Sequence, residues 1–227
     1  MTIFIVIMRI RIKVCCISSV FEAKMAIDHG ADALGLVGKM PSGPGPIADD
    51  LILSIAKSII PPTNTFLLTS ETDFESVVKH HHVTKTNTIQ FVDSVDASTY
   101  RKLRNVIPGI RFVQVIHVID EGSVEEAIEI SGHVDFLLLD SGNPKLAVKE
   151  LGGTGRVHNW KLSRKIRESI KIPLFLAGGI KAENARQAIE EVQPYGLDLC
   201  TGVRTNGDLD EMKLGMFFNS IHDLKVM

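Results

Sequence analysis

Two short apolar segments of the chain each end on a single reactive side chain. Residues 136–139 lead to the carboxyl group of Asp140, and the segment that begins at Arg11 leads to the thiol of Cys15. A carboxylate is costly to bury without a partner, so Asp140 either caps the next helix or serves a functional site. The residues after it, Ser-Gly-Asn-Pro, are typical of a loop and favour the site. Together the two groups could provide an acid and a base.

The alternation of residue types in the first segment predicts the direction of its thiol. An extended strand places Ile10, Ile12 and Val14 on one face and Arg11, Lys13 and Cys15 on the other. If the apolar face meets helices, Lys13 and Cys15 point into the interior, with Cys15 at its open end. A neighbouring ammonium group favours the thiolate form of Cys15. The simpler alternative is that Cys15 is a small buried hydrophobic residue.

Eight apolar runs of strand length alternate with longer amphipathic segments along the chain. The runs are residues 10–16, 33–37, 65–69, 88–92, 112–118, 136–140, 173–177 and 197–201. Near-continuous apolar strands between helices predict a covered parallel sheet or a closed barrel, and eight units in 227 residues fit a single-domain (β/α)8 TIM barrel over residues 1–227. The alternative, a doubly wound sheet, normally has a glycine-rich first turn, which residues 16–19 lack.

The composition is that of an ordinary globular protein, with 44% hydrophobic and 23% charged residues. The net charge of −2 gives no bulk attraction to nucleic acid or to an anionic membrane. Three cysteines cannot form a disulfide framework, which favours the cytoplasm. No zinc-binding spacing is present, and we interpret residues 80–82, three adjacent histidines, as a surface segment rather than a metal site. A monomer and a homodimer both remain open.

The first seven residues are apolar but too short to cross a bilayer, and they lack the features of a signal peptide. They either extend the chain before the first strand or precede a natural start at Met8.

Several glycine-bearing turns fall at the ends of predicted strands, where barrels of this type place their functional groups. Gly178 and Gly179 follow the seventh strand, and Thr201 and Gly202 lie at the end of the eighth. Backbone N–H groups in such turns bind phosphate, and the loops after strands seven and eight are where these barrels do so. Residues 152–155, Gly-Gly-Thr-Gly, form a third flexible loop.

Five motifs, in the same order, resemble those of the phosphoribosylanthranilate isomerase family. They are residues 13–17 for the family's K-I-C-G-I, 30–37 for G-A-D-x-L-G-F-V, 137–141 for L-L-L-D-S, 152–155 for G-G-T-G and 176–184 for L-A-G-G-L-x-x-E-N. The resemblance extends over nearly the whole chain from Met8.

This resemblance implies an Amadori rearrangement of a small phosphorylated sugar, N-(5-phosphoribosyl)anthranilate, in tryptophan biosynthesis. It implies that Asp140 is the general acid that opens the ring and that Cys15 is the general base that removes the C2′ proton. The implied substrate- and phosphate-binding residues are Gly178, Gly179, Thr201, Gly202, Gly153 and Lys39. No metal and no organic cofactor is required.

Several positions depart from the family pattern. The family's S-P-R arginine, placed to meet the anthranilate carboxylate, is absent from residues 40–45, and Lys39 is a substitute without a bidentate fork. The other departures are Val92-Asp93 for H-G, His158-Asn159-Trp160 for F-D-W, Arg204 for the glutamate of G-V-E and Cys16 for the glycine of K-I-C-G-I. They leave open a divergent barrel that acts on, or only binds, a different phosphorylated sugar.

Overall fold

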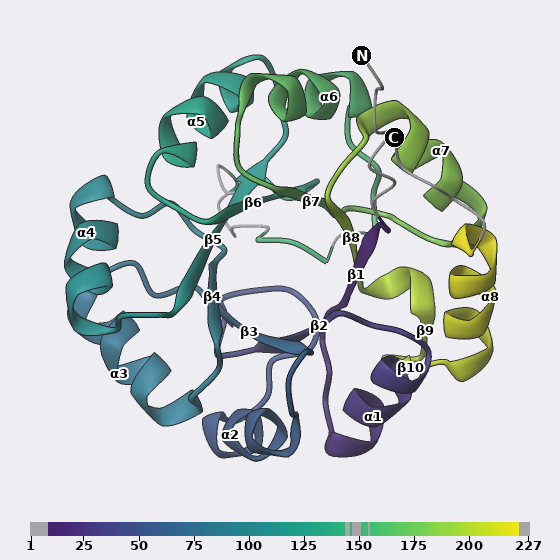
Figure 1. Cartoon of the computed structure of the whole chain (residues 1–227), viewed down its shortest axis with the longest axis horizontal. Coiled ribbons are helices and arrows are strands. Elements are labelled where there is room, and N and C mark those ends of the chain that lie inside the picture. The colour runs from purple at the N-terminus through teal and green to yellow at the C-terminus, as the bar shows by residue number, and fades with distance from the viewer. Residues whose placement is uncertain (1–8, 144–145, 147–150, 154, 223–227) are drawn as a thin grey trace, which may run out of the picture.

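The strands form a closed barrel in the computed structural model, which describes residues 9–143, 146, 151–153 and 155–222. Parallel strands follow one another in sequence order, and β1 closes the barrel by pairing with both β2 and β8 (Figure 1). They are β1 (Arg11–Val14), β2 (Ala33–Val37), β3 (Asn64–Thr69), β4 (Thr88–Phe91), β5 (Arg111–His117), β6 (Phe136–Asp140), β7 (Leu174–Leu176) and β8 (Gly196–Leu199). The predicted (β/α)8 barrel is confirmed, and the doubly wound alternative is wrong.

A ring of helices surrounds the strands (Figure 1). The helices are α1 (Val20–Asp28), α2 (Asp49–Ser58), α3 (Phe74–Thr84), α4 (Ala97–Val106), α5 (Gly122–Ser131), α6 (Trp160–Ser169), α7 (Ala182–Val192) and α8 (Glu211–Ile221). Ser19, Asp73 and Asp210 cap three of them by accepting a hydrogen bond from the backbone N–H three residues further on. Among the described residues, no helix is both long and apolar enough to cross a membrane.

The buried side chains form two layers, one on each side of the barrel wall. The outer layer lies between strands and helices and includes Ile10, Ile12 and Val14. The inner layer fills the barrel and includes Cys15 and aromatic side chains such as Phe175. The alternation predicted for the first strand is therefore confirmed: its apolar face meets the helices, and its other face supplies the interior.

The chain does not pass directly from β8 into the last helix. A short 3-10 helix, η1 (Thr201–Val203), follows β8, and then β9 (Arg204–Thr205) and β10 (Asp208–Leu209) pair antiparallel before α8 begins. The eighth strand is thus shorter than the predicted run 197–201, and Thr201 starts η1. This small insertion brings Arg204 beside α1 and the residues that follow β1.

The prediction that the three histidines form a surface segment is wrong for two of them. His80 lies between Thr69 Oγ1, at 3.0 Å, and Asp49 Oδ1, at 3.2 Å. His81 is buried, and its Nε2 lies 2.9 Å from the backbone oxygen of Thr86. Both therefore lie on the inward side of α3, and burial lowers the pKa of His81. No metal-binding group of His, Cys, Asp or Glu occurs among the described residues. Residues 1–7 lie outside the described part of the chain.

Candidate active site

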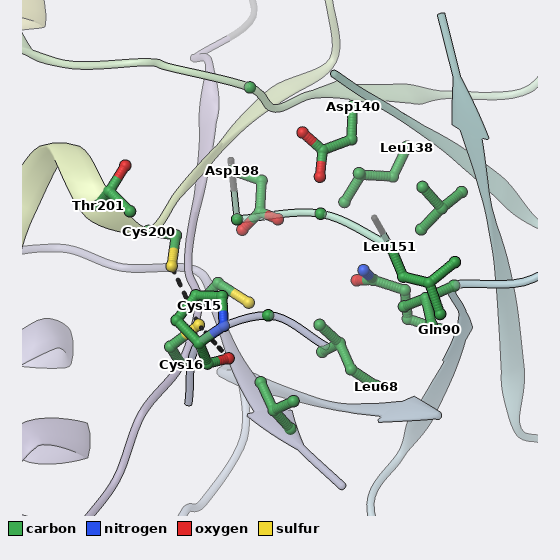
Figure 2. A pocket seen from close by; sticks show the side chains of 18 of the residues that line it. Cys15, Cys16, Leu68, Gln90, Leu138, Asp140, Leu151, Asp198, Cys200 and Thr201 are labelled. Carbon is green, nitrogen blue, oxygen red and sulfur yellow. Dashed lines mark hydrogen bonds between the residues drawn. The ribbon is translucent and has the colours of Figure 1, made fainter. Parts of the chain in front are cut away.

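A pocket opens at the carboxyl ends of the strands, where the sequence predicted the functional groups (Figure 2). Cys15, from the end of β1, and Asp140, from the end of β6, both line it although they are far apart in the sequence. Its wall is otherwise mixed, with the apolar Leu68 and Leu138 and the polar Gln90 among the lining residues. The structure therefore brings the predicted acid and base to one cavity.

Cys15 is buried directly after β1, and its backbone N–H donates to the Leu199 carbonyl at 2.7 Å, which fixes it to β8. The hydrogen bond with the thiol of Cys16 is the main cause that lowers the pKa of Cys15 to about 6. Burial opposes this shift, while the positive charges of Lys13 and Arg204 support it. The predicted effect of Lys13 is therefore real but secondary, and at neutral pH the thiolate predominates.

Lys13 forms a buried ion pair that the sequence analysis missed. Its Nζ lies 2.9 Å from Oδ2 of Asp198, the residue opposite it in the β1–β8 register. Burial raises the pKa of Asp198 to about 8, against the opposing effect of Lys13. Burial alone would lower the pKa of Lys13, but the charges of Asp198 and Cys15 outweigh it and hold that pKa above its ordinary value. One ammonium group thus faces two acidic groups, so the pocket stabilises the Cys15 thiolate more readily than a second anion at Asp198.

Asp140 is buried at the opposite side of the pocket. One carboxylate oxygen, Oδ1, accepts a hydrogen bond from the backbone N–H of Ser141 at 2.7 Å. The other, Oδ2, faces Gly152, where an added Cβ would lie 2.5 Å from it. The next helix in the described part of the chain is α6, and its cap is Asn159, so Asp140 does not cap a described helix. Figure 2 shows Asp140 and Cys15 at the pocket with Asp198 also in its wall.

Glycine-bearing turns form the side of the pocket after β7. Gly178 and Gly179 line it with positive φ angles of 80° and 65°, which only glycine adopts without strain. Thr201 and Gly153 also line it, and Thr154 lies outside the described residues. Gly202 is not a lining residue; a Cβ there would collide with the Ile180 carbonyl, so this glycine lets the loops after β7 and β8 approach each other.

Lys39 is exposed, and the structure does not bring it to the pocket. The residues of the loop after β2 that line the cavity are Met40, Ser42, Gly43 and Pro44. The role of Lys39 as a substitute for the family's arginine therefore stays a prediction that no lining contact supports.

The fold agrees with what similarity to known proteins shows. A family model described as N-(5'phosphoribosyl)anthranilate (PRA) isomerase matches residues 12–220. The chain belongs to this family. One relative, N-(5'-phosphoribosyl)anthranilate isomerase 2 of Methanosarcina mazei, is 36% identical over 217 residues, which cover 95% of this chain and 94% of the relative.

Solved structures of isomerases in this family have the same fold. That of Thermotoga maritima superimposes with a TM-score of 0.81 at 25% identity and covers 95% of this chain and 100% of its own. A second phosphoribosyl anthranilate isomerase, in complex with reduced 1-(o-carboxyphenylamino)-1-deoxyribulose 5-phosphate, gives 0.79 at 23% identity with the same coverage.

Membership of the isomerase family makes the conformation of Cys16 informative. Its φ angle is +62°, in the left-handed region that glycine adopts freely and other residues adopt at a cost of about 1–2 kcal/mol. The family's K-I-C-G-I motif has glycine here. This chain instead has a thiol at that position, and its Sγ lies 3.0 Å from Sγ of Cys200 in the pocket wall.

Proposed function

We propose that this protein is a phosphoribosylanthranilate isomerase of tryptophan biosynthesis, with Asp140 as general acid and Cys15 as general base. The substrate is N-(5-phosphoribosyl)anthranilate, and the product is 1-(o-carboxyphenylamino)-1-deoxyribulose 5-phosphate. The observation that carries this proposal is that Cys15 and Asp140 line one pocket beside the glycine turn after β7. A thiol whose pKa is lowered to about 6 suits a base that works at neutral pH.

The chemistry requires one proton donor and one proton acceptor. Asp140 protonates the furanose oxygen, the bond from C1′ to that oxygen breaks, and the nitrogen lone pair forms a C1′=N iminium. The Cys15 thiolate then removes the proton from C2′, and the electron pair released forms a C1′=C2′ bond and neutralises the nitrogen. The resulting enol becomes the C2′ ketone as C1′ gains a proton and the C2′ hydroxyl loses one.

Two buried oxygen atoms support a substrate that carries hydroxyl groups. Gln90 Oε1 and Asp198 Oδ1 belong to pocket-lining residues and have no hydrogen-bond partner among the described residues. Leaving such an atom unpaired costs about 1–3 kcal/mol. Sugar hydroxyls that reach these atoms remove that cost, so we assign the ribose portion to this part of the pocket. The phosphate then lies against the turn of Gly178 and Gly179.

A second candidate follows from the pocket's charge. None of its described lining residues is arginine or lysine, so among them no cation meets the anthranilate carboxylate. This observation favours the alternative of a divergent barrel that acts on, or binds, a phosphorylated sugar without an aromatic acid.

Turnover of the fluorescent substrate distinguishes the two candidates. We expect purified protein to consume N-(5-phosphoribosyl)anthranilate, measured as loss of fluorescence, and the reduced product analogue held by the relative to inhibit competitively. Wild-type turnover equal to buffer, together with isomerisation of another aminated ribose phosphate, would replace the first candidate by the second. Tight binding of the analogue without any turnover would point to a barrel that only binds its ligand.

The pH profile of activity should rise through about pH 6. The base must be unprotonated, so kcat/KM falls as pH drops below the Cys15 pKa of about 6. The phosphate of the substrate has a second ionisation at about pH 6 as well, so the profile needs a control without substrate. The rate of Cys15 alkylation by iodoacetamide provides it, and both measurements should give the same midpoint. An alkylation midpoint near that of a free thiol would contradict the prediction.

A further inference from the structure

A buried ion pair lies behind the pocket and connects the loop of the catalytic thiol to the segment after β8. Arg204, from β9, and Glu22, from α1, have side chains only 7% and 8% exposed, and Nη1 of Arg204 lies 3.1 Å from Oε1 of Glu22. Neither residue lines the pocket. The pair is therefore outside the set of groups that can touch the substrate in this structure.

The guanidinium group of Arg204 also holds the backbone on both sides of Cys16. Its Nη2 donates to the carbonyl oxygen of Cys15 at 3.0 Å and to that of Cys16 at 2.6 Å. Its Nη1 donates to the carbonyl of Gly207 at 2.8 Å. One planar cation thus fixes the carbonyls on either side of the Cys16 Cα, and so the turn that follows Cys15, a task that suits the rigid fork of arginine.

Glu22 holds Arg204 in this position and is itself fully engaged. Its Oε2 accepts from the backbone N–H of Ser18 at 2.9 Å, and its Oε1 accepts from that of Leu209 at 2.7 Å. Burial raises the pKa of Glu22, but Arg204 and these two N–H donors outweigh burial and lower it. The carboxylate is charged at neutral pH, so it compensates the buried guanidinium and ties the turn after β1 to β10.

The carbonyl contacts of Arg204 lie on both sides of Cys16, a residue with an unfavourable backbone conformation. Cys16 adopts a left-handed φ of +62°, which is unfavourable for a side-chain-bearing residue and persists only where surrounding contacts enforce it. Arg204 supplies such contacts through its two carbonyl bonds. Arg204 also stands where the family's G-V-E motif has glutamate, so the charge at this position is reversed. Glu22 provides the negative charge that the buried arginine requires.

We propose that Arg204, anchored by Glu22, is a positioning residue that holds the Cys15–Cys16 turn so that the Cys15 thiolate points into the pocket beside Lys13. The guanidinium also adds a positive charge close to the thiolate, in the direction that favours it. The effect on turnover rests on the proposed function of Cys15 as base. The effect on the reactivity of Cys15 does not, because it concerns the thiol itself.

Alkylation of Cys15 by iodoacetamide in the full-length protein tests the proposal without substrate. Fragment-ion mass spectrometry distinguishes alkylation of Cys15 from alkylation of Cys16. The rate is measured between about pH 5 and pH 9, a range that contains both the lowered pKa of Cys15 and the pKa of an ordinary thiol. Arg204→Met removes both carbonyl contacts and the charge, and we expect the midpoint to rise by about one unit, which lowers the thiolate fraction roughly tenfold below the midpoint. Glu22→Gln should shift it in the same direction by less.

The control is Arg164→Met, which removes the exposed pair of Arg164 with Glu168 on α6, far from the thiol in the sequence. It should leave midpoint and rate unchanged. In turnover assays Arg204→Met should lower kcat while KM stays close to the wild-type value, because Arg204 does not line the pocket.

An alkylation midpoint in Arg204→Met equal to that of the wild type, in a protein that melts cooperatively, would overturn the proposal. If Arg204→Met does not fold, Arg204→Lys is scored by the same midpoint, since lysine keeps the charge but has one nitrogen in place of the two that bind the carbonyls, Glu22 and Gly207; an unchanged midpoint and alkylation rate would overturn it equally. A Cys15→Ser protein that remains active would refute the proposed base, while the alkylation results would still decide the role of Arg204.

Discussion

Replacing Cys15 by serine should lower kcat by roughly 10²–10⁴-fold, the usual contribution of a positioned general base. Serine is close to cysteine in size, but its hydroxyl remains protonated at neutral pH, whereas the pKa of Cys15 is lowered to about 6. The neighbouring cation of Lys13 cannot make a hydroxyl into a base of comparable strength. Steady-state turnover of N-(5-phosphoribosyl)anthranilate measures the loss. The assay is run at about pH 7.5, where the Cys15 thiolate predominates.

The substitution should leave ligand binding intact. Cys15 acts on a proton in the transition state, so the Kd of the reduced product analogue should stay close to the wild-type value while kcat falls. A Cys15→Ser protein with normal kcat would remove Cys15 from the mechanism. Equal losses in binding and in turnover would instead assign it to holding the substrate.

Features that depend on one strand at a time could be predicted from the sequence. The positions of Cys15 and Asp140 followed from strand ends, because parallel strands that close into a barrel bring their carboxyl ends to one face. The inward direction of Lys13 followed from the period of two residues along a strand. The strand ends likewise predicted the turn of Gly178 and Gly179 after β7, and both residues line the pocket.

Features that depend on the register between strands could not be predicted. Asp198 is one acidic residue within an apolar run, and its role appears only when β8 is aligned with β1, which places it opposite Lys13. The partners Glu22 and Arg204 are 182 positions apart, and no local pattern relates them. Lys39 was chosen for its charge alone, and whether it lines the pocket depends on the path of the loop after β2; it is exposed and is not a lining residue.

Replacing Asp140 by asparagine should also lower kcat by roughly 10²–10⁴-fold. The amide matches the carboxyl group in size and still accepts the hydrogen bond from Ser141 N–H, but it cannot deliver a proton to the ring oxygen. The matched control is Asp120→Asn: Asp120 is an exposed residue after β5 that also accepts a backbone hydrogen bond, from Gly122 N–H at 2.9 Å, and it does not line the pocket. It should retain wild-type activity.

The assignment of acid and base predicts different slow steps in the two variants. Without the acid, opening of the ring limits the rate, so substrate deuterated at C2′ should react with Asp140→Asn as fast as ordinary substrate. Without the base, removal of the C2′ proton limits the rate, and the same substrate should react distinctly more slowly with Cys15→Ser. Because the two residues serve successive steps of one reaction, their losses should not add in the double variant. An isotope effect in Asp140→Asn and none in Cys15→Ser would reverse the two roles.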